Sequence, residues 1–281
     1  MSEGRPIVRT IIGERMESSY LKIDEAHKRA KEVLGEYEIK PETFEGFYDK
    51  EMLKRDAAEV ERLEEIFNLE KNPSKIYGDI LEAVMCEHGE LSDWFGPDSQ
   101  VMKTASFDDY INKIDMVVET ESKDRRFSHL ALGIDVTFGS RDLSKKFNGI
   151  RAKIDNKTLG EIKYFHSDRQ NFSGRLTKIP QVVVGVELER AKEVALLWMN
   201  RKNKELAVHP IQVVVLEEAA LQLKTFADYS RKSGRSETAV LLEAELRKIE
   251  ELLAMKKAAG IQSLPNDKVF EEIRRNLSLF R

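Results

Sequence analysis

Two apolar stretches that each contain a single aspartate constrain the fold of this chain more than any other feature. Asp115 lies in the stretch Ile114-Asp115-Met116-Val117-Val118, and Asp135 lies in Ile134-Asp135-Val136-Thr137-Phe138. Both stretches are typical of strands. A carboxylate on a buried strand is costly unless it is paired or binds a cation. Two of them on neighbouring strands favour a divalent metal held by oxygen ligands. The alternative is that both lie at strand ends, where they are hydrogen-bonded or solvated.

The bulk properties predict a soluble protein with one large domain and helical extensions. The chain has 281 residues, of which 41% are hydrophobic and 34% are charged, so it can bury a sizeable core and also carry solvated helices. The single cysteine, Cys86, excludes a disulfide framework and a cysteine-based zinc cluster. The first residues lack an apolar signal region, and no run approaches the length of a membrane span. We therefore expect a cytoplasmic protein that does not contact a membrane.

The hydrophobic pattern divides the chain into three parts. Residues 1–73 are predicted to be a helical N-terminal extension, residues 74–208 an α/β core, and residues 209–281 a C-terminal helical hairpin with a tail. The fold class is predicted to be α/β, with a mixed central sheet of about four to five strands flanked by helices. Strands are expected near residues 114–118, 134–138, 159–165 and 180–186. The segment around Gly174 is predicted to be a loop.

The charge distribution changes sharply within the predicted core. Residues 76–140 contain five Lys or Arg against thirteen Asp or Glu, whereas residues 141–178 contain ten against four. An acidic segment followed by a basic one is typical of a metal site beside a phosphate-binding surface. Phosphate contacts are predicted from basic residues of the helix expected over residues 142–153 and just before it, which are Arg141, Lys145, Lys146, Arg151 and Lys153. The alternative is that they form a solvated helix face.

The order of an acidic helix, two aspartate strands, a helix and a further strand resembles the PD-(D/E)xK nuclease superfamily over roughly residues 74–186. The resemblance implies an α/β fold that hydrolyses phosphodiester bonds of DNA or RNA with Mg²⁺ or Mn²⁺, as DNA repair nucleases do. In that family a helical Glu and a strand Asp help to hold the metal ion. An acidic residue two positions before a Lys lies on the following strand, and the Lys positions water or stabilises developing charge.

Two alignments of the chain with this motif are open. In the first, Asp115 is the first aspartate and Asp135-Val136-Thr137 stands where (D/E)xK is expected. Thr137 cannot supply the positive charge, so that Lys113 or Lys163 would have to do so. In the second, Asp135 is the first aspartate and Glu161-Ile162-Lys163 is a literal ExK, although a helical segment then separates strands that should be adjacent. The first alignment is preferred because its strands follow each other directly.

The helical carboxylate of the resemblance is assigned to Glu87, which lies at the edge of the apolar face of the helix expected after Ser74. Glu82 and Glu90 remain alternatives if that helix is rotated or ends early. The resemblance thus implies that the metal ligands are Glu87, Asp115 and Asp135. It also implies that the catalytic residues are Asp115, Asp135 and one lysine, either Lys113 or Lys163.

The C-terminal residues Asn276-Leu277-Ser278-Leu279-Phe280 resemble the short peptide by which bacterial DNA-processing proteins dock on the sliding clamp. The family prefers Gln at the position of Asn276. The resemblance implies docking through Leu277, Leu279 and Phe280, and the alternative is that these side chains pack on the domain itself. The helical ends also offer surface for a homodimer. The rival to the enzyme is a catalytically inactive, nuclease-like or helical scaffold that acts through partner binding.

Overall fold

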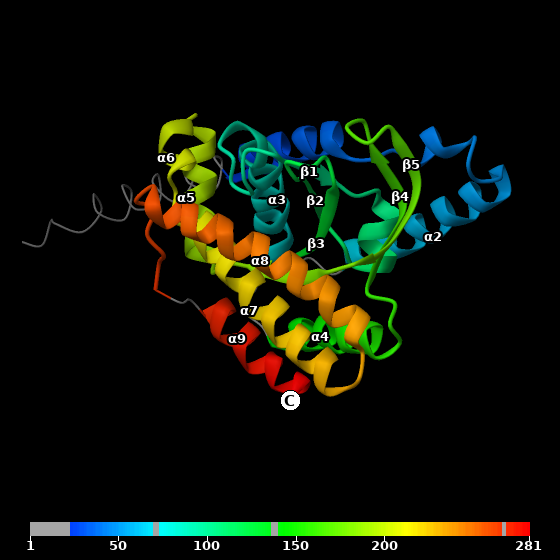
Figure 1. Ribbon diagram of the computed structural model, residues 1–281. Coiled ribbons are helices and arrows are strands. Elements are labelled where there is room, and N and C mark those ends of the chain that lie inside the picture. The colour runs from blue at the N-terminus through cyan, green and yellow to red at the C-terminus, as the bar shows by residue number, and fades with distance from the viewer. Residues whose placement is uncertain (1–22, 70–72, 136–139, 266–267) are drawn as a thin grey trace, which may run out of the picture.

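The computed structural model shows a mixed α/β fold in which helices surround a four-stranded sheet (Figure 1). It describes residues 23–69, 73–135, 140–265 and 268–281. The predicted fold class is therefore confirmed, including the helical parts near both ends of the described chain. The helical N-terminal part comprises residues 23–37, the short 3₁₀ turn η1 (Pro41–Phe44) and α2 (Lys50–Leu69).

The central sheet contains the two aspartate strands side by side. Its order is β1 (Ser99–Lys103), β2 (Met116–Glu121), β3 (Phe127–Asp135) and β6 (Gln181–Gly185). The first three strands form an antiparallel meander, and β6 pairs with β3 in parallel. Parallel strands need a crossover connection, which here contains α4 (Ser140–Asp155) and a β-hairpin.

That hairpin forms a second sheet of two antiparallel strands, β4 (Gly160–Ser167) and β5 (Phe172–Ile179). The predicted loop around Gly174 is thus wrong, because residues 172–179 pair with β4, and Gly174 itself pairs with Phe165. Gly174 has a φ of 149°, which a side chain would disfavour. Strand β1 was not expected either. Only Val101 and Met102 of its five residues are apolar, so it lacks the longer apolar run that indicated β6.

Most remaining helices lie around the central sheet (Figure 1). They are α3 (Pro73–Leu91), α5 (Leu188–Met199), α6 (Asn203–Ala207), α7 (Ile211–Lys232), α8 (Ser236–Ala258) and α9 (Lys268–Asn276), followed by the 3₁₀ turn η3 (Leu277–Phe280). The predicted helices at residues 211–232 and 237–259 agree with α7 and α8, which pack along each other.

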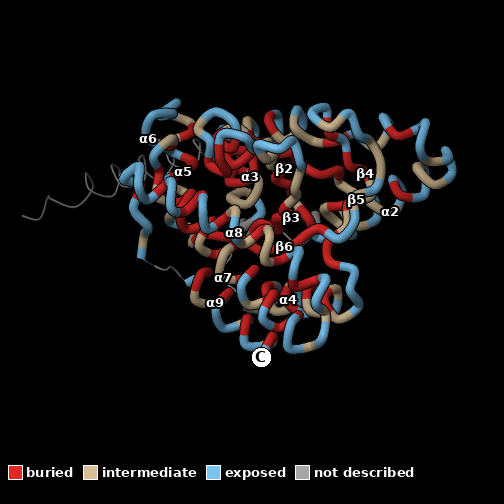
Figure 2. Tube along the Cα trace, in the orientation of Figure 1, coloured by how far each residue is buried: buried red, intermediate tan, exposed pale blue. Residues whose placement is uncertain are grey.

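The two faces of the central sheet are buried in two separate apolar clusters. On one face, Met116 and Leu132 pack with residues of α3, α4, α5, α7, α8 and η3. On the other face, Val117 and Ala131 pack with residues of η1, β4 and β5. The alternation follows from the strand period of two. Figure 2 shows the buried residues concentrated at the sheet and α3, whereas α2 is mostly exposed or intermediate.

Helix α7 closes the outer edge of β6 with side chains. The Gln222 amide accepts a hydrogen bond from the Val183 N–H (2.9 Å) and donates one to its carbonyl (2.6 Å). The Glu218 carboxylate accepts from the Gly185 N–H (2.8 Å). These bonds satisfy backbone groups that an edge strand would otherwise expose to another chain. The C-terminal helices therefore share the core with the sheet.

One stretch in the described part of the chain, residues 203–232, is long and apolar enough to span a membrane. However, 67% of its most apolar window is buried inside the fold. It belongs largely to α7, so its apolar composition is that expected of a helix buried in the core.

Candidate functional site

The candidate site is centred on Asp115, which directly precedes β2. Its carboxylate Oδ2 accepts a hydrogen bond from the N–H of Ile134, near the end of β3, at 2.5 Å. The Asp115 side chain thus accepts a hydrogen bond from the Ile134 N–H at a point where the backbone pairing of β2 with β3 has ended. Burial raises the pKa of this carboxyl well above its usual range, and the nearby charges of Asp109 and Glu82 raise it further.

Three further charged side chains meet Asp115 from different elements. Glu82 lies on α3, Lys103 ends β1, and Asp109 lies on the turn between β1 and β2. The Lys103 Nζ atom lies 3.0 Å from Glu82 Oε2 and 2.7 Å from Asp109 Oδ2. Burial raises the pKa of Glu82. Burial opposes ionisation of Asp109 as well, but the charge of Lys103 and a hydrogen bond from Asp115 outweigh it and lower the Asp109 pKa. We call Glu82, Lys103, Asp109 and Asp115 the carboxylate cluster.

A single π-helical turn, η2 (Asp108–Asn112), carries Asp109 to this cluster. Its buried neighbour Asp108 fixes the turn on β4, because the Asp108 carboxylate accepts hydrogen bonds from the N–H groups of Lys163 (2.7 Å) and Tyr164 (3.0 Å). The turn ends at Lys113, whose φ of 58° lies in the left-handed region. Single π turns of this kind are frequent at functional sites.

Lys146 of α4 reaches the same end of β3. Its Nζ atom donates to the carbonyl oxygen of Ile134 (3.1 Å), the residue whose N–H donates to Asp115. Its charge acts on both Asp109 and Asp115 by lowering the pKa of each carboxyl. The sequence predicted Lys146 as a phosphate contact. The structure places it on α4, with its ammonium at the end of β3.

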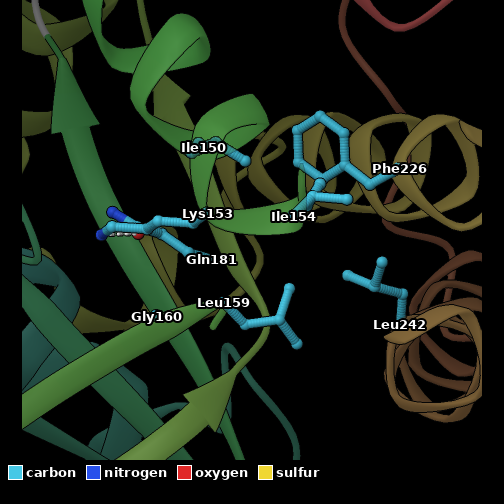
Figure 3. A pocket seen from close by; sticks show the side chains of 8 residues that line it. All are labelled: Ile150, Lys153, Ile154, Leu159, Gly160, Gln181, Phe226 and Leu242. Carbon is cyan, nitrogen blue, oxygen red and sulfur yellow. Dashed lines mark hydrogen bonds between the residues drawn. The ribbon is translucent and has the colours of Figure 1, made fainter. Parts of the chain in front are cut away.

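Lys153 and Gln181 support the segment that leads into Asp115. Lys153 Nζ donates to the Asn112 carbonyl (3.1 Å) and to the Gln181 side chain (2.8 Å), while the Gln181 amide donates to the Lys113 carbonyl (2.8 Å). Figure 3 shows Lys153 and Gln181 side by side at a small cavity whose other walls include Phe226 and Leu242. Burial lowers the Lys153 pKa. Lys153 is therefore a support for this segment and not part of an exposed phosphate-binding face.

The other predicted phosphate contacts are dispersed. Lys145 is exposed on α4. Arg151 donates to the Tyr229 hydroxyl (3.3 Å) and lies 3.8 Å from the Asp155 carboxylate. The side chain of Arg141 is outside the described part of the structure.

Glu87, the predicted helical ligand, lies away from Asp115. It pairs with Arg29 (3.2 Å) and accepts a hydrogen bond from the indole N–H of Trp198 (2.5 Å), and so fixes α3 against α5 and the helix over residues 23–37. Glu90 is exposed. Of the three glutamates considered from the sequence, the structure brings Glu82 to the cluster.

The two predicted catalytic lysines do not converge on Asp115. Lys163 Nζ pairs with Asp56 of α2 and lies over the rings of Phe107 and Tyr48, at 4.9 and 5.3 Å. The side chain of Lys113 is exposed. The second alignment combines Asp135, which ends β3 of the central sheet, with two residues of the other sheet. Glu161 and Lys163 lie in the two-stranded sheet, and Glu161 pairs there with Arg175 (2.5 Å).

Asp135 is the last residue of β3, and its backbone pairs with Gly185. Its side chain lies outside the described part of the structure, as do Val136 and Thr137. Among the described side chains, no three His, Cys, Asp or Glu residues are arranged to hold one metal ion.

The C-terminal tail packs on the core. Leu277 and Phe280 are buried, and the Phe280 ring lies against Phe226 and Tyr229, with centroids 4.6 and 5.6 Å away. This is the alternative noted for the tail. Docking on a sliding clamp would first require Phe280 to leave this position.

Comparisons with protein-family models, with curated proteins and with solved structures found no match to this chain. The sequence did not indicate Lys103 or Asp109 as members of the cluster. For Lys103, the available signal was a lysine directly after the apolar residues Val101 and Met102.

Proposed function

We propose that this protein is a divalent-metal-dependent nuclease that hydrolyses phosphodiester bonds of DNA or RNA in the cytoplasm. The observation that carries the proposal is the meeting of Asp115, Glu82 and Lys146 at the end of β3, whose last residue is Asp135. Glu82 lies on α3, Asp115 at the start of β2 and Asp135 at the end of β3, which is the helix and the two strands of the first alignment. Lys146 lies on α4, whereas that alignment considered Lys113 or Lys163.

The donor chemistry suits Mg²⁺ or Mn²⁺. Both ions bind carboxylate oxygens. The carboxylates of Asp115, Asp109 and Glu82 are crowded in a largely buried place, where Asp109 and Glu82 raise the pKa of Asp115 and Asp109 raises the pKa of Glu82. A divalent cation would relieve this repulsion. We assign Asp115, Asp135 and Glu82 as its ligands, with Glu82 in place of Glu87.

A bound Mg²⁺ would polarise the phosphate and neutralise its negative charge. The chain itself would contribute a second positive charge through Lys146. Because the Ile134 carbonyl holds the Lys146 ammonium beside Asp115, this group is placed to stabilise charge that develops on a phosphate at the cluster. Lys146 thus takes the role considered for Lys113 and Lys163.

One observation favours the inactive, partner-binding alternative. Lys103 already pairs with Glu82 and Asp109, so these two carboxylates are satisfied without a metal ion. On that view the cluster stabilises the fold, and the exposed surfaces of the helical ends bind a partner, including a second copy of the chain.

Calorimetry tests the proposal directly. We expect Mg²⁺ or Mn²⁺ to bind wild-type protein, and Asp115→Asn and Asp135→Asn to abolish binding. Asp124→Asn, in the exposed turn between β2 and β3, is the matched control because Asp124 pairs only locally with Arg126 and Ser122. Cleavage assays on single- and double-stranded DNA and RNA then identify the substrate. Absence of binding at millimolar metal in the folded wild type would refute the nuclease.

A further inference from the structure

Lys103 occupies the middle of the carboxylate cluster. It is 8% exposed, and its Nζ atom lies within 3.0 Å of Glu82 and 2.7 Å of Asp109. A lysine is rarely buried to this extent unless it is paired. Its ammonium therefore lies between the two carboxylates nearest Asp115. A divalent cation bound by these carboxylates would occupy the same position.

A metal ion and the Lys103 ammonium would compete for the same oxygens. Both need the negative charge of Glu82, and two cations held within a few ångströms in a buried site repel each other strongly. Lys146 supplies a further positive charge close by. Entry of a divalent cation therefore favours movement of the Lys103 side chain out of the cluster.

The structure offers a place for the displaced ammonium. Lys103, Glu82 and Asp109 line an open surface pocket of about 270 Å³. Its wall also carries the carboxylates of Glu38, Glu64 and Asp79 and the lysines Lys31 and Lys75. Glu38 already pairs with Lys40 and Asp79 with His27, so Glu64 is the carboxylate that would receive the charge. A lysine has a flexible four-carbon stem, so its ammonium can move by several ångströms without a backbone change.

We propose that Lys103 is an internal counter-cation that holds the carboxylate cluster together without metal and that a divalent cation must displace to load the site. This inference rests on the proposed metal-dependent function. It assigns Lys103 a role in setting metal affinity, distinct from the catalytic role of Lys146. The protein would consequently bind Mg²⁺ more weakly than its carboxylates alone allow.

The test is calorimetric titration of the full chain with MgCl₂ and MnCl₂, together with thermal unfolding at each metal concentration. Lys103→Met should bind the metal about ten-fold more tightly or better. The same variant should be destabilised without metal and recover stability as metal is added. Lys256→Met is the matched control, because Lys256 is also 8% exposed but donates to the Asp93 carbonyl (2.6 Å), outside the cluster. It should leave metal affinity unchanged.

Lys103→Gln provides the same test if Lys103→Met does not fold, since an amide can still donate hydrogen bonds to both carboxylates. If wild type binds the metal ion and neither variant binds it more tightly, the role of Lys103 is overturned and the proposed nuclease function is not. Binding by the variants alone would support the role of Lys103 and overturn a metal-dependent activity of the wild type. Absence of binding in wild type and variants would overturn both.

Discussion

Asp115 and Lys146 contact the same peptide residue from two elements. Ile134 donates its N–H to the Asp115 carboxylate (2.5 Å) and accepts the Lys146 ammonium at its carbonyl (3.1 Å). One residue of β3 therefore fixes a carboxyl group and an ammonium group of the candidate site relative to each other. Because Ile134 itself is buried, this arrangement depends on the packing of the sheet and not on a surface loop.

Replacing Lys146 by Met should lower nuclease activity with little change in metal affinity. Loss of one preorganised charge at a reacting phosphate typically costs about 10²-fold to 10³-fold in rate. Lys224→Met, at an exposed position of α7 and not among the predicted phosphate contacts, is the control and should retain activity. The measurement is the single-turnover cleavage rate at saturating Mg²⁺. Equal losses in the two variants would contradict a specific role for Lys146.

Glu119 should make stability depend on pH in the acidic range. Burial alone would raise its pKa, but hydrogen bonds from His129, Gln170 and Ser167 outweigh burial and lower the pKa from 4.5. The unfolded chain therefore takes up a proton before the folded protein does. The contribution is complete above pH 4.5 and is lost as the pH falls through the folded pKa. Urea unfolding between pH 3 and 7 should show a smaller acid loss in Glu119→Gln. A pH dependence identical to that of wild type would contradict this assignment.

The ion pair between Asp56 and Lys163 should anchor α2. Asp56 is buried, and its carboxylate also accepts a hydrogen bond from the Tyr164 hydroxyl (2.6 Å). Removing one partner of such a pair costs about 3–5 kcal/mol. Lys163→Met should lower the free energy of unfolding by about this amount and speed hydrogen exchange in α2. Glu59→Gln, which breaks an exposed pair with Arg62 on the same helix, should leave both close to wild type. Exchange in α2 that is equal in both variants would exclude the anchor.

Two glycine-to-alanine substitutions should act in opposite directions. A Cβ atom at Gly89 of α3 would lie 2.4 Å from Val101 Cγ2 on β1, whereas one at Gly149 of α4 meets nothing within 4 Å. Gly89→Ala should destabilise by about 1–3 kcal/mol through overpacking. Gly149→Ala should stabilise by about 0.5–1 kcal/mol because alanine favours the helix. Denaturant midpoints measure both, and a stabilised Gly89→Ala would show that α3 can move freely over β1.

Phe280→Ala should destabilise the fold by about 3–5 kcal/mol, because its ring fills a space lined by Phe147, Phe226 and Tyr229. Ser278→Ala, at an exposed position of the same turn, is the control. If the tail also docks on a sliding clamp, an isolated peptide of residues 276–281 should bind the clamp more tightly than the folded chain does. Unchanged stability of Phe280→Ala would show that the tail is not part of the core.

The sequence predicted the fold better than the site. The apolar residues around Asp115 and Asp135, and the short polar turn between the two stretches, predicted that the strands next to these aspartates are adjacent. By contrast, the choice among Glu82, Glu87 and Glu90 depended on the rotation of α3 against β1. That rotation is set by contacts such as Gly89 with Val101, which no local pattern reveals. The position of Lys103 required β1, in which only Val101 and Met102 are apolar, too few to indicate a strand. Lys146 was recognised as basic, but its reach to Ile134 depends on how α4 folds back onto β3.

The parallel pairing of β3 and β6 also has a consequence for how the chain acquires its structure. Ala131 pairs with Gln181, fifty positions later, so α4 and the β4–β5 hairpin must be accommodated before this pairing can close. The β1–β2–β3 meander needs only short connections. Long-range parallel pairing is slow because the entropy of loop closure is lost before the contacts between the strands can compensate for it. The carboxylates of the meander should therefore come together early in folding, while α7 and β6 complete the edge of the sheet last.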